Sequence, residues 1–178
     1  AKAIITQREL GSDMLTFAAG LKHVLRQDPD IIMVGEMRDL ESIALTLTLA
    51  ETGHLVLATL HTLNASQVMD RIVDVFPAHQ QEQIRLQFSM VLNCIVAQKL
   101  LPRRDGGMVA AREILINTPA VSNIIRENKV PQIKTVMQTS ADKGMITMKQ
   151  SIKDLYESGL IDEDVAKATL VDDIKIGA

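Results

Sequence analysis

Residues 29–39 read PDIIMVGEMRD, and residues 53–62 read GHLVLATLHT. Each stretch contains a short apolar run that ends in polar residues, and the residues between them have the pattern of one amphipathic helix. A strand, a helix and a second strand in this order predict two buried, parallel strands of an α/β fold. Ligands bind at the carboxyl ends of the strands in such sheets. We therefore expect Glu36 and His61, which follow the two strands, to project into one crevice.

Composition limits the classes of protein that this chain can represent. Its 178 residues suffice for one domain with a small appendage, and 47% of them are hydrophobic. The net charge of −3 and the aromatic content of 2% argue against a nucleic-acid partner. The single cysteine, Cys94, cannot form an internal disulfide, which suits a reducing compartment. Since no apolar run approaches the length of a membrane span, we expect a cytoplasmic protein without direct membrane insertion.

Periodicity and turn residues predict the remaining elements. We expect strands at residues 4–9, 30–34 and 54–60, a hairpin formed by residues 94–101 and 109–116, and helices at residues 16–27, 40–52, 65–75, 80–92, 120–128, 131–139, 147–158 and 162–168. Everything after Thr118-Pro119 is helical in pattern. We therefore expect an α/β core over residues 1–117 and a helical region over residues 118–178.

The two polar strand ends each allow two interpretations. A carboxylate in the position of Glu36 can hold a magnesium ion through water or position an attacking water, but it can also simply pair with Arg38. His61 can act as a sensor that hydrogen-bonds a terminal phosphate or a carboxylate neighbour, but it can also cap the following helix. His54 lies seven residues before His61, about 20 Å away along an extended strand and on the opposite face. The two histidines therefore cannot share a metal ion.

Phosphate-binding features are limited in this sequence. Arg8, Arg26, Arg38 and Arg71 could reach phosphates within a subunit or across an interface, although a single arginine is more often a surface residue. No Gly-x-x-x-x-Gly-Lys-Ser/Thr loop occurs in the 178 residues. The phosphate cradle of a P-loop enzyme is therefore missing from this chain.

Several strings together resemble the PilT-like type IV pilus retraction (twitching motility) ATPases of the secretion-ATPase superfamily. Residues 35–39 (GEMRD) resemble the Walker B segment of that family, residues 52–62 (TGHLVLATLHT) resemble its His box, and residues 70–77 (DRIVDVFP) and 98–101 (QKLL) also fit. Residues 120–127 (AVSNIIRE) are similar to the family's retraction motif, with serine at position 122 where the family has arginine. The resemblance extends from about residue 5 to residue 161.

The resemblance implies roles for individual residues. Glu36 would be the Walker B glutamate, which serves magnesium coordination or water activation, and His61 would be the His-box residue near the nucleotide. Four further residues would lie close to the nucleotide, namely Arg38, Thr59, His54 and Arg71. The retraction-type motif would consist of Ala120, Asn123, Ile124, Ile125, Arg126 and Glu127.

The resemblance also implies a fold and partners. The fold would be a partial RecA-like P-loop ATPase core that lacks the P-loop strand and helix, followed by a helical C-terminal tail. The family's amino-terminal domain, Walker A loop and Asp box would precede Ala1, so we expect a carboxyl-terminal fragment that does not hydrolyse ATP alone. The parent protein would use ATP and magnesium, form a hexameric ring and act on the inner-membrane pilus platform protein.

Two alternatives remain open at this point. One is a related pilus-assembly or type II secretion ATPase, although assembly members commonly carry a tetracysteine zinc module that a lone Cys94 cannot form. The other is a non-catalytic assembly module that only docks subunits through its helical tail.

Overall fold

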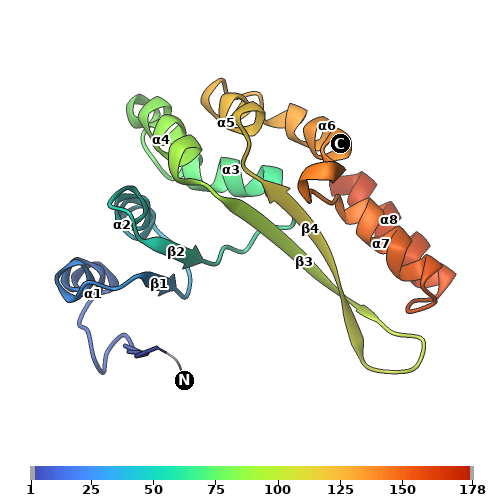
Figure 1. Cartoon of the computed structure of the whole chain (residues 1–178), viewed down its shortest axis with the longest axis horizontal. Helices are drawn as coiled ribbons and strands as arrows, with labels where there is room; N and C mark the ends of the chain where they lie inside the picture. The colour runs from blue at the N-terminus through green and yellow to red at the C-terminus, as the bar shows by residue number, and fades with distance from the viewer. Residues whose placement is uncertain (1–2, 177–178) are drawn as a thin grey trace.

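The computed structural model describes residues 3–176, and its first regular elements are one helix and two βα units. Helix α1 (Phe17–Val24) continues into the 3-10 turn η1 (Leu25–Gln27), and the chain then alternates between β1 (Ile31–Val34), α2 (Leu40–Glu51), β2 (Leu55–Ala58) and α3 (Ala65–Asp74). Strands β1 and β2 are parallel, with Ile31 opposite Leu55 and Val34 opposite Ala58. Figure 1 shows α1 and α2 beside this small sheet. The predicted strand–helix–strand unit is therefore present.

A long antiparallel ribbon forms the middle of the molecule. Helix α4 (Ala78–Val91) leads into β3 (Cys94–Pro102), which pairs along its whole length with β4 (Met108–Ile116). The turn between them contains Gly106 and Gly107, both at positive φ, a conformation that glycine adopts without steric strain. The predicted hairpin is confirmed, but it forms a sheet separate from that of β1 and β2.

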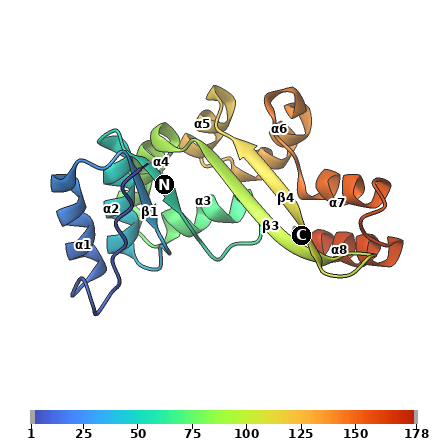
Figure 2. The ribbon, with the colours of Figure 1, turned by 60° about the horizontal axis from the view of Figure 1, so that its bottom comes forward.

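The residues after the ribbon are helical, as predicted. They form α5 (Pro119–Arg126), the short turn η2 (Val130–Gln132), α6 (Ile133–Thr139), the turn η3 (Ala141–Lys143), α7 (Met148–Glu157) and α8 (Glu163–Ile176). In Figures 1 and 2 these helices lie on the side of the ribbon away from α1 and α2. Residues 1–2 and 177–178, the outer ends of the two predicted regions, lie outside the described residues.

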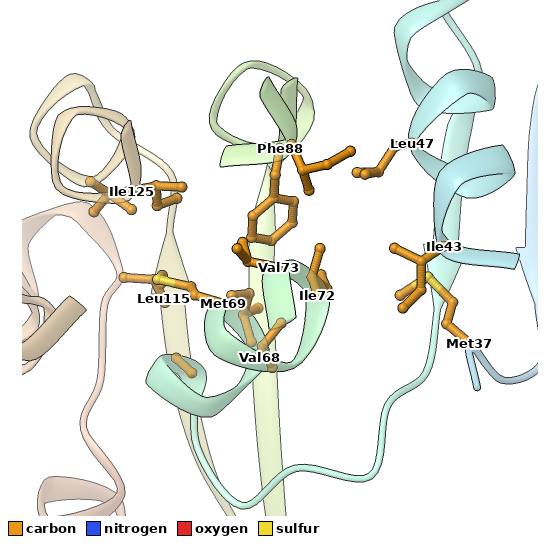
Figure 3. Close-up of a cluster of buried hydrophobic side chains, with 14 of the residues drawn as sticks. Met37, Ile43, Leu47, Val68, Met69, Ile72, Val73, Phe88, Leu115 and Ile125 are labelled. Carbon is orange, nitrogen blue, oxygen red and sulfur yellow. The ribbon is translucent and has the colours of Figure 1, made fainter. Parts of the chain in front are cut away.

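Two clusters of buried side chains stabilise this arrangement. The larger one joins α2, α3 and α4 to α5 and α6, and Figure 3 shows Phe88 of α4 above the α3 side chains Ile72 and Val73. The smaller one packs α7 and α8 against the ribbon around Leu101 and Ile152. Helices α5 and α6 therefore belong to the same hydrophobic core as the βα units, while α7 and α8 share a core with the ribbon.

Some sequence-based expectations were wrong. Residues 4–9 form no strand, and an isolated bridge between Leu10 and Met14 is the nearest β pairing. The strands were expected to be buried, but β1 is buried on one face only, because Ile31 is 59% exposed and Met33 is 71% exposed. Strand β2 has no fully buried residue, and only Val56 is half-buried. Within α4, the apolar Leu86 is exposed although Ile84 is buried, because the two residues lie about 200° apart around the helix.

A helix that crosses a membrane must be both long and apolar. In the part of the chain that the structure describes, no helix combines the length and the apolar character needed to cross a bilayer.

Candidate functional site

The loops that follow β1 and β2 are hydrogen-bonded to each other. The Met37 amide donates to the Thr59 carbonyl oxygen at 3.1 Å, and the Thr59 hydroxyl donates to the Gly35 carbonyl oxygen. Because the strands are parallel and in register, both loops leave the same edge of the sheet. The pairing continues beyond the strands and brings Glu36 and His61 to one place.

Glu36 is the centre of this site. Its Oε1 atom lies 2.8 Å from Nε2 of His61, and its Oε2 atom lies 2.6 Å from Nη2 of Arg38. The Glu36 side chain is 23% exposed, whereas that of His61 is 85% exposed. Glu36 and His61 are therefore in direct contact at the carboxyl ends of the two strands, and Glu36 also pairs with Arg38.

The charges at this site keep Glu36 ionised. The hydrogen bond from Arg38 is the main cause of the lowered pKa of Glu36, and the positive charge of Arg38 and the contact with His61 act in the same direction. Partial burial opposes them and does not outweigh them. The same pair raises the pKa of Arg38. Glu36 is thus a carboxylate whose two oxygens are each oriented by a different neighbour.

An open hollow lies next to His61. It has a volume of about 350 Å³ and is lined by His61, Thr62, Gln67, Asp70, Arg71, Asp74 and Val75. Most of these residues come from the polar side of α3, whose opposite side is buried. The predicted candidates His61 and Arg71 therefore border the same space. Gln67, Asp70 and Asp74 were missed by the sequence reasoning, although their spacing of three and four residues marks one helix face.

The local sequence explains how α3 starts beside His61. Asn64 is the N-cap, and its side chain accepts a hydrogen bond from the Gln67 amide at 2.9 Å. The Gln67 side chain in turn accepts one from the Leu63 amide at 2.9 Å. This reciprocal pair resembles a capping box. It defines the course of the chain between His61 and the first turn of α3.

Asp70 and Asp74 lie four residues apart on α3. Burial raises the pKa of Asp70, and the negative charge of Asp74 adds to the effect. Two carboxylates on one helix face attract cationic groups into this part of the hollow.

His54 lies away from these residues. Its Nδ1 atom is 3.0 Å from the Leu49 carbonyl oxygen and 3.1 Å from the Thr52 hydroxyl, so the ring sits at the carboxyl end of α2. This is the amino-terminal end of β2, opposite to the end that carries Thr59 and His61. The structure therefore does not bring His54 together with the other nucleotide-site candidates. No three His, Cys, Asp or Glu side chains among residues 3–170 are grouped so that they could hold a metal ion.

The retraction-type motif forms the amphipathic helix α5. Ile124 and Ile125 face the core, whereas Asn123, Arg126 and Glu127 are exposed. The Asn123 amide donates to Glu127 at 3.0 Å, and Arg126 reaches the Asn123 side-chain oxygen at 3.4 Å. The pKa of Glu127 is lowered, mainly by its 2.6 Å contact with Lys129.

Ser122, where the motif departs from the family pattern, is half-buried. Its hydroxyl lies 3.0 Å from the Ser89 carbonyl oxygen and 3.0 Å from the Asn117 side-chain oxygen. It therefore joins α5 to α4 instead of offering a charge to the surface. Ala120, by contrast, is exposed on the first turn of α5.

Comparisons with known proteins bear on the family to which this chain belongs. A twitching motility protein of Neisseria gonorrhoeae is 53% identical over 167 residues, which are 93% of this chain and 45% of that protein. The type IV pilus retraction ATPase PilT of Pseudomonas aeruginosa is 49% identical over 166 residues, which are 93% of this chain and 48% of that protein. A crystal structure of the pilus retraction motor PilT with bound ADP matches with a TM-score of 0.84 and 49% identity, over 92% of this chain and 46% of that one.

These matches confirm the predicted fold class, an α/β core of the PilT type followed by a helical part. The chain spans less than half the length of the relatives that it matches. The family model described as "Type II/IV secretion system protein" matches residues 6–111, more than half of the chain. The chain therefore belongs to the type II/IV secretion system protein family, and it is similar to that family's pilus retraction ATPases.

Proposed function

We propose that this chain forms the hydrolysis and sensing part of a nucleotide site in an ATPase motor that powers pilus retraction. The observation that carries the proposal is the contact between Glu36 and His61, which joins the ends of two parallel strands. Ligand sites of α/β proteins occur at this end of the strands. The similarity to proteins named for twitching motility and pilus retraction, over 93% of the chain, supports the choice of motor.

Glu36 acts on the attacking water or on the magnesium ion that accompanies the nucleotide. The donor set suits this ion, because Mg²⁺ prefers carboxylate oxygens and usually binds through one or two carboxylates, several waters and substrate phosphates. Magnesium at such a site neutralises charge that develops on the phosphoryl oxygens. The lowered pKa of Glu36 keeps its carboxylate charged and available for this role.

His61 senses the nucleotide through Glu36. Its ring contacts the carboxylate with one nitrogen and borders the open hollow, so a phosphate that reaches His61 also alters its hold on Glu36. Arg38 fixes the second oxygen of Glu36 from the loop after β1. Arg71 faces the hollow and offers a positive charge to a phosphate or to a neighbouring subunit.

The assembly that we propose follows the same relatives. The protein forms a homohexameric ring in the cytoplasm, peripheral to the inner membrane, and passes force to the pilus platform protein. The exposed side of α5, formed by Ala120, Asn123, Arg126 and Glu127, is available for such a contact. We take ATP as the substrate and magnesium as its accompanying ion.

Substitution of Glu36 tests this proposal in the protein of natural length. Glu36→Gln keeps the shape of the side chain but removes its charge. We expect ATP turnover to fall by a factor of about 100 or more while binding of a labelled nucleotide is retained. Unchanged turnover would remove Glu36 from the mechanism.

A pair of histidine variants supplies the matched control. His61→Gln should reduce turnover strongly, whereas His54→Gln should not, because His54 lies at the opposite end of β2 and contacts the end of α2. Equal losses in the two variants would contradict the assignment of His61.

A further inference from the structure

Glu113, a residue of β4, connects two helices that are far apart in the sequence. Its Oε1 atom accepts a hydrogen bond from the Ala65 amide at 2.8 Å, and its Oε2 atom accepts one from the Met148 amide at 3.3 Å. Ala65 is the first residue of α3, and Met148 is the first residue of α7. In Figures 1 and 2, β4 runs between these two helices.

The two helix starts share one pattern of capping. Asn64 caps α3 through the amide of its third residue, and Thr147 caps α7 through the amide of its third residue. Neither cap reaches the amide of the first residue, which has no partner within its own helix. Glu113 accepts both of these amides. Its negative charge is also favourable at two positive helix ends at once.

These amides have little access to water. Ala65 is 1% exposed and Met148 is 4% exposed, so a water molecule cannot readily replace the carboxylate. A buried amide without a partner is costly, and the position of each helix start therefore depends on Glu113. The residues beside Glu113 reinforce the contact with α7, because the Arg112 amide donates to Ser151 and Ile114 exchanges two hydrogen bonds with Ile146.

We propose that Glu113 is a positioning residue that couples the tail helix α7 to the His61 loop, which we define as residues 59–64. Ala65 follows this loop directly, so the hold of Glu113 on its amide helps to determine where His61 stands relative to Glu36. Strand β4 continues from Glu113 toward Thr118, the N-cap of α5. The same residue thus links the proposed sensing histidine to the part of the chain that carries the retraction-type motif. The role in catalysis rests on the proposed function, whereas the structural coupling does not.

The test uses the protein of natural length and two variants at one position. Met148→Pro removes the amide that Glu113 accepts, while Met148→Ala truncates the side chain but keeps the amide. Proline is favoured at the first position of a helix, and Thr147 before it already has the extended conformation that proline requires. The two variants therefore differ chiefly in one hydrogen bond to Glu113.

Hydrogen exchange measured by mass spectrometry reports on the coupling. We expect the peptide that contains the His61 loop and Ala65 to exchange at least about threefold faster in Met148→Pro than in Met148→Ala, because the freed carboxylate holds Ala65 less firmly. Equal exchange in the two variants would overturn the proposal. This measurement needs no ATP turnover, so it stays informative if the proposed function fails.

Kinetics report on the catalytic part of the proposal. Glu113→Gln leaves one acceptor oxygen for two amides. This variant also provides a test if Met148→Pro does not fold. We expect kcat for ATP hydrolysis to fall about tenfold or more with little change in KM, since the His61 loop acts on the chemical step. A merely structural role would leave kcat of the folded fraction unchanged, and that result together with unchanged exchange at Ala65 would refute the coupling.

Discussion

The side chain of Asn117 connects α5, the helix that carries the retraction-type motif, to α4. Its side-chain amide donates to the carbonyl oxygens of Ser89, at 3.1 Å, and Leu92, at 2.8 Å. Its oxygen accepts a hydrogen bond from the Ser122 hydroxyl at 3.0 Å. One amide thus joins the end of α4 to the start of α5.

Replacement of Asn117 by alanine removes all three contacts. The Ser89 oxygen keeps the hydroxyl of Ser122, whereas the Leu92 oxygen loses its side-chain donor. Because the Ser122 hydroxyl can still donate to Ser89, the net loss is about two hydrogen bonds. At roughly 1 kcal/mol for each, we expect the free energy of unfolding to fall by about 2 kcal/mol. Asn117→Asp has the same shape but turns a carboxylate toward two carbonyl oxygens. We expect it to be less stable than the alanine variant by about 1 kcal/mol or more near pH 7.

The pH dependence of the Asn117→Asp variant has a definite sign. Repulsion by the two carbonyl oxygens raises the folded-state pKa of the introduced carboxyl group above the value of an unfolded aspartate, about 3.9. The contribution of this group to stability is fully present below that value and is lost as the pH rises through the raised folded-state pKa. The difference in the free energy of unfolding between Asn117→Asp and Asn117→Ala should therefore become smaller as the pH falls from about 7 to about 5.

Urea unfolding followed by circular dichroism measures these differences, because the chain contains no tryptophan. With a slope of roughly 2 kcal/mol per molar urea, a loss of 2 kcal/mol shifts the midpoint by about 1 M. An Asn117→Asp variant that equals the wild type, or exceeds the alanine variant near neutral pH, would refute the donor geometry of Asn117.

Three other contacts each lead to a prediction. Ile125→Ala should lower the free energy of unfolding by about 2–5 kcal/mol, because Ile125 is 1% exposed; an unchanged urea midpoint would contradict this burial. Asp39→Ala should cost about 1 kcal/mol, since the Asp39 carboxylate accepts the Ser42 amide at the start of α2, and calorimetry should show a lower Tm. Arg38→Ala should raise the pKa of Glu36, because Arg38 is the main cause of its lowering; a carbon NMR titration in which the Glu36 midpoint does not move to higher pH would contradict that cause.

Local signals in the sequence predicted most of the elements. Apolar periodicity predicted a helix at residues 65–75, and the residues that carry it, Val68, Met69 and Ile72, form the buried side of α3. The Gly-Gly turn predicted the hairpin, whose partners are close in sequence. The expected strand at residues 4–9 did not form, because a strand is stabilised by a partner and alternation alone does not provide one.

Burial was harder to predict than secondary structure. Ile31 and Met33 belong to an apolar run that suggested cover on both faces, but within residues 3–176 one face of β1 is exposed. The apolar character of a residue shows that it tolerates burial. It does not show which part of the protein packs against it.

The site was predicted in part. Glu36 and His61 were expected to meet because strand ends in a parallel sheet share an edge, a rule that needs only the order of the elements. Glu113 could not be found in this way. Its two partners are 48 and 35 residues away, and a half-buried glutamate within a strand has no local pattern that distinguishes it.

The electrostatics of Glu36 favour a role in orientation over a role as a general base. A general base works best when its pKa lies near the working pH, since it must accept a proton in the transition state. Arg38 and His61 lower the pKa of Glu36 instead, which makes the carboxylate a weaker base and a more persistent negative charge. A persistent charge is suited to orienting a water molecule or a hydrated magnesium ion. We therefore infer that Glu36 contributes chiefly by orientation, and that His61 and Arg38 serve it by holding one oxygen each.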